Sequence, residues 1–407
     1  MPQRPFAPRH TRCVLGALLL CSMLGGMPAR ARAQPRGPVE SGQALMALLP
    51  FRLTEAEAPN GYALYDETAT PNVALAFTAA PEERAALLRG LRESGRVAGL
   101  QQTFVPRAPA NASLARLLVA LYRDPAAAAT AVDTTAPPGG AQSEPLAGPP
   151  LGDHDRAMTV TTSGRTDQIL VVWSVGPILL AVTMQGPDAD AARAFRFAET
   201  AQSHAAATPA PADLAVASLA GGDDDRQLAV AAAVEAAQLP AAAPPSPFQR
   251  GGEYLWSNEQ IVLDARRPEV TAQLLSSEWL RVVATAQYFT TSDASRAVLT
   301  SAIAVFGDAA GAQQAVEEIS LGPTARQAVL PLAPPLHLGE ETLAYKSVLI
   351  WPRGEIRDSY TVQWRRNNAV LSVTVNLPPT KETPPYLDAV AAAFDSAYET
   401  AGPAIAP

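Results

Sequence analysis

The clearest periodicity lies near the C-terminal end of the chain. Apolar residues alternate with polar ones over 360–365, and a second run of apolar residues follows at 369–375. Alternation with a period of two predicts β-strands. The pair Asn367-Asn368 separates the two runs, and asparagine tolerates positive φ, so we expect a tight hairpin turn there. A helix should then close the segment, with one apolar face formed by Leu387, Val390, Ala391, Phe394 and Tyr398.

Two further strands and a helix are predicted upstream of this hairpin. Residues 281–289 and 298–306 are rich in β-branched and aromatic side chains, which favours strands. Asp308 follows, and aspartate is a favoured N-cap residue. Ala312 and Val316 recur after it at helical spacing, so the pattern predicts a helix that begins at Asp308.

The same succession of blocks occurs earlier in the chain, at offsets of 184 to 191 residues. Five blocks keep their order, and the offset changes only where proline, glycine and polar residues cluster, as expected for insertions in loops. We interpret this as an internal duplication. The matched blocks are 81–88 with 268–275, 96–104 with 281–289, 119–132 with 303–316, 151–153 with 338–340, and 167–187 with 358–378.

The duplication predicts the domain organisation. We expect a leader at 1–33, one repeat unit at 41–206, an Ala/Pro/Gly-rich linker at 207–230 and a second unit at 231–402. Each unit should be an α+β domain in which an antiparallel sheet packs against two or three helices. We expect the sheet and its helices to form two layers.

The first residues have the pattern of an export signal. Three arginines precede an apolar run at 14–27, and Ala31-Arg32-Ala33 then offers a small-x-small cleavage site. The run is shorter than the roughly 20 residues that span a bilayer, so cleavage is favoured over a retained anchor. A lipid anchor on Cys21 is disfavoured, because Leu20 stands where lipoprotein signals normally have a small residue. We expect a secreted, periplasmic or cell-envelope protein with no transmembrane span after cleavage.

Charge and composition exclude several classes of function. The 407-residue chain has 31 basic and 39 acidic residues, and the leader holds five of the arginines, so the cleaved chain has a net charge of about −13. Binding to nucleic acid needs a basic face and is therefore not expected. Both cysteines, Cys13 and Cys21, lie in the leader, so we expect neither disulfides nor thiol chemistry in the cleaved chain.

Known catalytic and cofactor motifs are missing. The sequence contains no glycine-rich phosphate loop, no Gly-x-Ser-x-Gly and no His-Glu-x-x-His, so no cofactor, metal site or catalytic residue is predicted. His154, His204 and His337 are widely separated, and Asp223-Asp224-Asp225 is interpreted as a solvated linker turn. We expect Trp173 and Trp364, at equivalent strand positions, to be core residues.

The order of elements in each unit resembles a known group of proteins. A strand is followed by Asp-x-x-x-Ala-x-x-x-Val, then by Leu-Gly-Asp/Glu, an apolar hairpin and a closing helix. This order resembles the extracytoplasmic domains of bacterial exported lipoproteins and sensor ectodomains, and is similar in outline to the PsbP/LpqN-like group. The resemblance implies an α+β fold and an envelope location, and it brings no catalytic residues.

The one candidate binding group is formed by arginines. Arg353, Arg357, Arg365 and Arg366 surround the predicted hairpin of the second unit, where the first unit has apolar residues such as Val175. Such a group can bind a carboxylate, a phosphate or an anionic glycan, or it can simply solubilise a hairpin tip. We therefore expect a non-enzymatic binding, sensor or envelope-interaction module with a small-molecule, glycan or protein partner outside the cytoplasm. A secreted hydrolase that uses paired carboxylates and a structural envelope protein with an exposed apolar patch are the alternatives.

Overall fold

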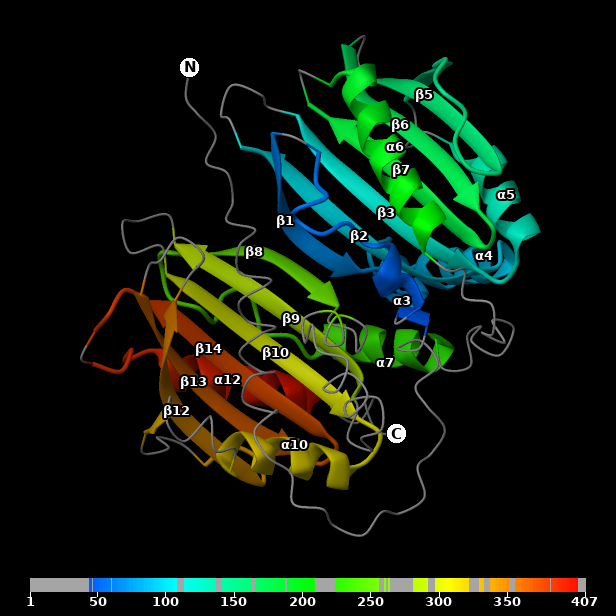
Figure 1. Cartoon of the computed structure of the whole chain (residues 1–407). Helices are drawn as coiled ribbons and strands as arrows, with labels where there is room; N and C mark the ends of the chain where they lie inside the picture. The colour runs from blue at the N-terminus through cyan, green and yellow to red at the C-terminus, as the bar shows by residue number, and fades with distance from the viewer. Residues whose placement is uncertain are drawn as a thin grey trace. The chain divides into compact units, whose positions relative to one another are not determined.

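A computed structural model describes most of the chain after the first 43 residues. The described residues are 44–45, 47–59, 61–107, 113–136, 141–162, 165–186, 189–208, 224–255, 260, 263, 281–291, 297–321, 329–332, 337–350, 356–380 and 382–401. The chain divides into two compact units, Pro38–Asp225 and Arg226–Pro407, which we call the N-terminal unit and the C-terminal unit (Figure 1).

The N-terminal unit is built on one seven-stranded antiparallel sheet with the order β1-β2-β3-β7-β6-β5-β4. Its strands are β1 (Tyr62–Ala69), β2 (Arg96–Pro106), β3 (Leu114–Tyr122), β4 (Gln142–Pro145), β5 (His154–Thr162), β6 (Arg165–Val175) and β7 (Ile178–Gln185). Its described helices are η1 (Leu49–Phe51), α3 (Asn72–Phe77), α4 (Arg84–Glu93), α5 (Pro125–Thr134) and α6 (Ala191–Ala207).

The C-terminal unit repeats this topology. Its antiparallel sheet has the order β8-β9-β10-β14-β13-β12-β11, so each strand takes the place of the strand with the same rank in the N-terminal sheet. The strands are β8 (Phe248–Leu255), β9 (Arg281–Thr291), β10 (Val298–Phe306), β11 (Val329–Pro331), β12 (Glu341–Ile350), β13 (Ile356–Arg366) and β14 (Ala369–Leu377). The helices bounded by described residues are α7 (Asp224–Ala236), α10 (Ala309–Leu321) and α12 (Leu387–Ala401).

The expected fold class is confirmed, since the chain contains two similar antiparallel α+β units. The predicted strands and the predicted helix after Asp308 coincide with β9, β10 and α10, and the side chain of Asp308 accepts a hydrogen bond from the backbone N–H of Gly311 at 2.8 Å. The predicted apolar face of α12 is buried from Leu387 to Tyr398. Local sequence signals were therefore sufficient to predict the order of these elements in the C-terminal unit.

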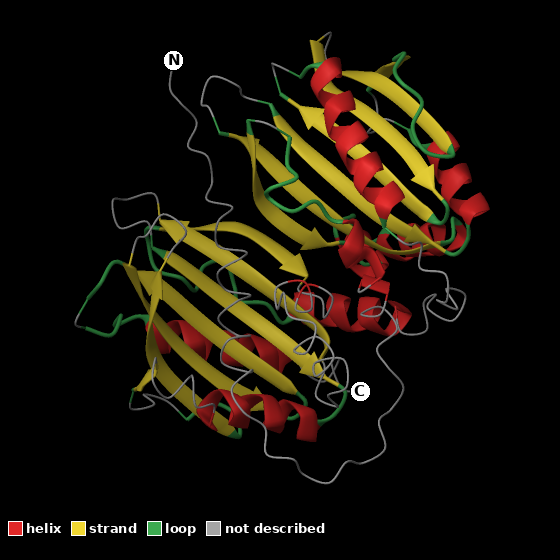
Figure 2. Ribbon diagram, viewed as in Figure 1, coloured by secondary structure: helices red, strands yellow, loops and turns green. Residues whose placement is uncertain are grey.

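The expectation of two layers is wrong, because helices cover both faces of each sheet (Figure 2). In the N-terminal unit, Val171 and Trp173 of β6 pack in the core on the α6 side, while Leu170 and Val172 pack in a second core on the α5 side. In the C-terminal unit, α12 covers one face, and α10 contacts β10, β13 and β14 on the other. The alternation of apolar and polar residues in β13 predicted that only its apolar side would be buried. Its polar residues Thr361 and Gln363 are buried as well, on the side that α10 covers.

The duplicated Leu-Gly-Asp/Glu motif has the same structural role in both units. Gly152 and Gly339 have φ of 55° and 57°, and a side chain there would clash with the carbonyl oxygen of the facing strand. The acid that follows each glycine accepts a hydrogen bond from the first residue of the hairpin turn: Asp153 from the N–H of Gly176 at 2.8 Å, and Glu340 from that of Asn367 at 2.9 Å. The motif thus fixes the β6–β7 and β13–β14 turns, which is why both copies retain it.

One detail of the sequence interpretation changes. The expected linker at 207–230 is too long at its C-terminal end, because α7 begins at Asp224 and its apolar residues are buried at helical spacing, so that part of the triple aspartate opens a helix. The leader expected at 1–33 and the matched block at 268–275 lie outside the described residues. No helix among the described residues is long and apolar enough to cross a membrane.

Candidate functional site

The predicted arginine group does not form one cluster. Arg357 and Arg366 stand near opposite ends of β13, about 30 Å apart at the usual rise per residue of a strand. Arg357 is buried, with 6% of its surface exposed. Arg353 lies outside the described residues. Only Arg365 and Arg366 are neighbours, at the tip of the hairpin, and Arg365 is ion-paired with Glu340.

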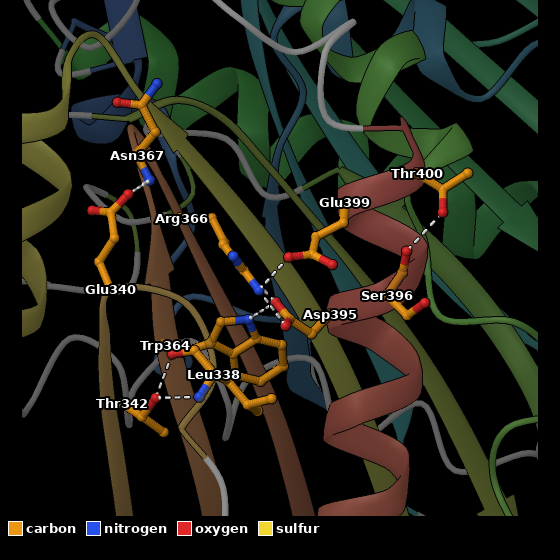
Figure 3. Close-up of polar contacts among 10 residues, drawn as sticks. All are labelled: Leu338, Glu340, Thr342, Trp364, Arg366, Asn367, Asp395, Ser396, Glu399 and Thr400. Atoms are coloured by element: carbon orange, nitrogen blue, oxygen red, sulfur yellow. Dashed lines mark hydrogen bonds and ion pairs between the residues drawn. The ribbon is translucent and has the colours of Figure 1, made fainter.

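Arg366 belongs to a charged cluster between the hairpin and α12 (Figure 3). Its Nε donates to Oδ1 of Asp395 at 2.9 Å, and its Nη2 lies 2.5 Å from Oδ2 of the same carboxylate. The Nη2 atom also lies 2.6 Å from Oε1 of Glu399, one turn further along α12. Asp395 in addition accepts a hydrogen bond at 2.8 Å from the indole N–H of Trp364, which is buried in the core. The cluster therefore joins the core of the sheet to the hairpin tip.

The electrostatics of this cluster argue against a free anion site. The hydrogen bond to Asp395, followed by the charges of Asp395 and Glu399, raises the pKa of Arg366 above its ordinary value. The three carboxylates of Glu340, Asp395 and Glu399 outnumber the two guanidinium groups of Arg365 and Arg366. An incoming anion would have to displace a carboxylate that is already held by short contacts. The cluster is therefore best explained as a stabilising link.

The N-terminal unit lacks this cluster. Trp173 stands in the position of Trp364, but the register of the strands and the burial pattern of the helices place Ala198 where the C-terminal unit has Asp395. Val175 takes the place of Arg366. The indole N–H of Trp173 consequently has no hydrogen-bond partner among the described residues. Both tryptophans are fully buried, which confirms the expectation that they are core residues.

A cavity in the N-terminal unit is the better candidate for a binding site. It has a volume of about 690 Å³, within the usual range of small-ligand pockets. One side is formed by successive turns of α6, and the other by the end of the loop that precedes β1. The lining residues are Ala58, Pro59, Tyr62, Arg193, Arg196, Phe197, Glu199, Thr200 and Ser203.

Two arginines give this cavity its charge. Arg193 and Arg196 are three residues apart on α6, so both lie on the cavity side of the helix. Arg193 has only a 4.0 Å contact to Asp190, and its buried Nη1 has no hydrogen-bond partner within the described parts of the chain. Arg196 is exposed, and no ion pair joins it to a described residue. In an acidic protein, two such guanidinium groups beside one carboxylate, Glu199, make a local basic site.

Apolar and aromatic side chains form the floor of the cavity. The rings of Tyr62 and Phe197 meet edge to face, with centroids 4.9 Å apart, and both residues are buried. The Tyr62 hydroxyl donates to the carbonyl oxygen of Ser113, at 3.3 Å. The site therefore combines an aromatic floor with cationic walls, an arrangement that suits a ligand with an apolar body and an anionic group.

The loop wall of the cavity is anchored to α6 by ionisable groups. Glu57 accepts hydrogen bonds at 2.7 Å from both the N–H and the hydroxyl of Thr54, and these bonds, assisted by His204, lower its pKa below the ordinary value. Oε1 of Glu57 lies 2.9 Å from Nδ1 of His204 on α6, and Nε2 of His204 lies 2.8 Å from the carbonyl oxygen of Pro50. His204 thus ties the loop to the helix.

The other chemistry considered from the sequence finds little support in the described residues. Two smaller cavities, of about 420 and 330 Å³, flank the proline-rich residues 378–385. Each of the three cavities is lined by one carboxylate, Glu199, Glu382 or Asp388, whereas a hydrolase of the expected kind needs two. No cluster of three or more His, Asp or Glu side chains suited to a metal ion occurs among the residues described.

Exposed apolar side chains are few. Of the described large hydrophobic residues with high exposure, Leu330, Val348 and Ile356 lie on the adjacent strands β11, β12 and β13, and Leu87 lies on α4. The first three share one face of the sheet by register. Three side chains form a modest apolar strip, so the alternative of a structural envelope protein gains only limited support.

Sequence reasoning missed both Asp395 and the α6 cavity. Asp395 was hidden on the apolar face of α12, where its neighbours at helical spacing are Ala391 and Tyr398, and an acid at such a position is the signal that was available. Arg193 and Arg196 lie outside the apolar face of α6, where arginines are ordinary, so they gave no such signal. A cavity itself has no sequence signal, because it depends on which side chains meet across the fold.

Comparison with known proteins does not assign the chain to a family. No family model matches the sequence, and no curated protein is significantly similar to it. Its function must be argued from its own residues.

Proposed function

We propose that this protein is an exported, non-enzymatic binding module whose N-terminal unit holds a small organic anion in the α6 cavity. The observation that carries the proposal is the pair of arginines, Arg193 and Arg196, in a cavity with an aromatic floor. A guanidinium group binds carboxylates and phosphates through two parallel hydrogen bonds. The export signal at 1–33 and the outline resemblance to exported lipoprotein and sensor domains support an extracytoplasmic location.

Comparison with the C-terminal unit supports a specific role for this site. Aligned by their burial patterns, α6 and α12 place Val390 and Ala393 where the N-terminal unit has Arg193 and Arg196. Val390 is buried in the core. A purely structural requirement of the fold would be met by apolar residues, as it is in α12. The two arginines are therefore an addition of the N-terminal unit, in keeping with a ligand that only this unit binds.

Titration calorimetry with the full-length exported protein tests the proposal. The probes are benzoate, 4-hydroxybenzoate and phenyl phosphate, which combine a ring with an anionic group, and benzyl alcohol serves as a neutral reference. We expect saturable binding of at least one anion and none of benzyl alcohol. The double variant Arg193→Gln/Arg196→Gln should weaken binding at least tenfold, because each hydrogen bond to a charged group contributes about 1.5–3 kcal/mol.

A matched control separates a specific site from bulk charge. Arg89 is exposed on α4 of the same unit and does not line the cavity. Arg89→Gln removes the same kind of charge and should leave the affinity within a factor of two. Equal affinities for the wild type and the double variant, or no saturable binding of any anion by the wild type, would refute the proposal.

A further inference from the structure

Gln363 of β13 is buried in an unusual way. Only 1% of its surface is exposed, and neither its amide oxygen nor its amide nitrogen has a hydrogen-bond partner among the described residues. Trp364 faces α12, so by the alternation of a strand Gln363 points to the α10 face of the sheet. Buried polar groups are almost always hydrogen-bonded, and a side-chain amide with all of its bonding capacity unused requires an explanation.

Gln363 belongs to a layer of polar side chains that crosses four strands. The strand register places Ser347, Ser359 and Asn376 in one cross-strand row, Tyr345, Thr361, Thr374 and Thr300 in the next, and Gln363 with Ser372 in the third. Thr361 and Thr374 share a hydrogen bond at 3.0 Å. The hydroxyls of Thr300 and Ser347 and the amide oxygen of Asn376 are buried without a partner in the described structure. Four residues of one layer therefore present unused hydrogen-bonding groups.

The duplicated N-terminal unit shows that the fold does not require polarity at five of these nine positions, Gln363 among them. Five of the equivalent positions on the α5 face belong to an apolar core that packs against Ala128 and Val132 of the helix. The other four are polar in both units: Gln168, Gln185, Thr183 and Arg116 stand where the C-terminal unit has Ser359, Asn376, Thr374 and Thr300. Strand register relates five residues of that core to polar residues of the C-terminal unit. Met158, Val160, Leu170, Val172 and Ala181 correspond to Tyr345, Ser347, Thr361, Gln363 and Ser372.

The helix that covers the layer presents small side chains to it. α10 contacts β10, β13 and β14, and its buried residues include Ala312, Ala315 and Val316. None of these three side chains carries a hydrogen-bonding group, so they cannot satisfy the polar rows below them. Alanines also give a helix little apolar surface with which to hold its place on a polar face.

The chemistry of the layer indicates a neutral ligand. Its unused groups are an amide and hydroxyls that both donate and accept hydrogen bonds, together with an amide oxygen that accepts. Arg357 and Arg365 lie at the two ends of β13, outside the three rows, and Arg365 is paired with Glu340. An uncharged compound with groups that both donate and accept hydrogen bonds, such as hydroxyls, complements this surface.

We propose that the layer between the C-terminal sheet and α10 binds a small neutral polyhydroxyl compound, a monosaccharide or polyol, whose hydroxyls would bridge Gln363 and Thr300, the unused group nearest to Gln363 by register. α10 moves away from the sheet to admit the ligand and closes over it. This site differs from the α6 cavity in unit, ligand charge and lining residues, so each proposal stands or fails without the other.

Saturable binding to the full-length protein is the test. The probes are glucose, ribose, myo-inositol and glycerol, measured by titration calorimetry and by thermal unfolding over a concentration series. Polyols stabilise most proteins by exclusion from the surface, an effect that grows without saturation, so saturation is the distinguishing sign. We expect one or more probes to saturate, and we expect hydrogen exchange of α10 backbone amides to slow when that probe is bound.

Two variants and one matched control locate the site. Gln363→Leu removes the amide at similar size and should weaken binding at least tenfold, while the unliganded variant becomes no less stable. Thr300→Val, which removes another unused hydroxyl of the layer, gives an independent, smaller loss of about threefold if the first variant folds poorly. The control is Ser301→Ala, because the Ser301 hydroxyl is also buried without a partner in the described structure but faces α12 in the same sheet. It should bind like the wild type.

Three outcomes would overturn the proposal. They are an unsaturable thermal shift of the same size in wild type and Gln363→Leu, a saturable affinity that Gln363→Leu leaves unchanged, and an equal loss of affinity in Ser301→Ala. The first would mean that water alone hydrates the layer.

Discussion

Asp395→Ala tests how much the cluster between the hairpin and α12 contributes to stability. Asp395 is 7% exposed and accepts hydrogen bonds from both the indole of Trp364 and the guanidinium of Arg366. Alanine removes the acceptor and leaves the Trp364 N–H fully buried with no acceptor from α12. Because a buried donor that loses its partner costs about 1–3 kcal/mol, this part of the loss should dominate.

The contribution of the ion pair is smaller. The side chain of Arg366 is 29% exposed, and after the substitution it still has Glu399 at 2.6 Å. Exposed pairs contribute about 0–1 kcal/mol, so we expect a total loss of about 1–4 kcal/mol in the free energy of unfolding. Asp395→Asn keeps an oxygen that can accept from the indole, and it should lose only about 1 kcal/mol.

Urea unfolding followed by far-ultraviolet circular dichroism measures this loss. The chain has two units and can unfold in two steps, so the shift should fall in one transition and leave the other in place. In the Asp395→Ala background, Trp364→Phe removes the orphaned donor and should cost less than it does in the wild type. A loss below about 0.5 kcal/mol in Asp395→Ala, or strict additivity with Trp364→Phe, would refute the reasoning.

Two other predictions follow from the same structure. Trp173→Phe should cost less stability than Trp364→Phe, because the Trp173 N–H has no partner to lose among the described residues, and urea unfolding of both variants compares them. Glu57→Gln should lower stability at neutral pH but not in acid: hydrogen bonds from Thr54 lower the pKa of Glu57 below 4.5, so its contribution is present above about pH 4.5 and disappears as the pH falls through the lowered value. Unfolding midpoints of wild type and variant should therefore converge at low pH, and a constant difference would contradict the assignment.

Much of the fold could be predicted from sequence because its signals are local. Asp308 marked the start of α10, and Asn367, with φ of 53°, marked the hairpin turn. The duplication strengthened each assignment, since two copies of the same element rarely share the same misleading pattern. The alternation of β13 nevertheless led to one wrong inference. Its polar residues were compatible with a solvent face, and only the position of α10 shows that Thr361 and Gln363 are buried.

The candidate sites could not be predicted because they depend on non-local contacts. Asp395 meets Arg366 across 29 residues, and that meeting requires a particular rotation of α12 about its axis. Arg365 and Arg366 were singled out from the sequence, but the carboxylates that pair with them lie on other elements with no distinctive spacing: Glu340 and Glu399 are exposed, and Asp395 is buried. Charge patterns along one segment cannot reveal which opposite charges fold against it.

Each unit has its own sheet of the same topology, and the unpaired indole of the N-terminal unit and the unpartnered polar rows of the C-terminal unit lie on opposite faces of it. Each unit thereby keeps one well-packed face that stabilises it. The N-terminal unit has an apolar layer under α5 and carries its unpaired indole and its arginine-lined cavity on the α6 side. The C-terminal unit closes the corresponding side with Asp395 and carries its unpartnered polar rows under α10. One well-packed face supplies most of the burial that the fold needs, so the opposite face can accept polar groups that lower stability. The duplicated chain therefore has two faces of this kind, and they differ in chemistry: one carries a cavity lined by arginines, and the other carries neutral polar rows.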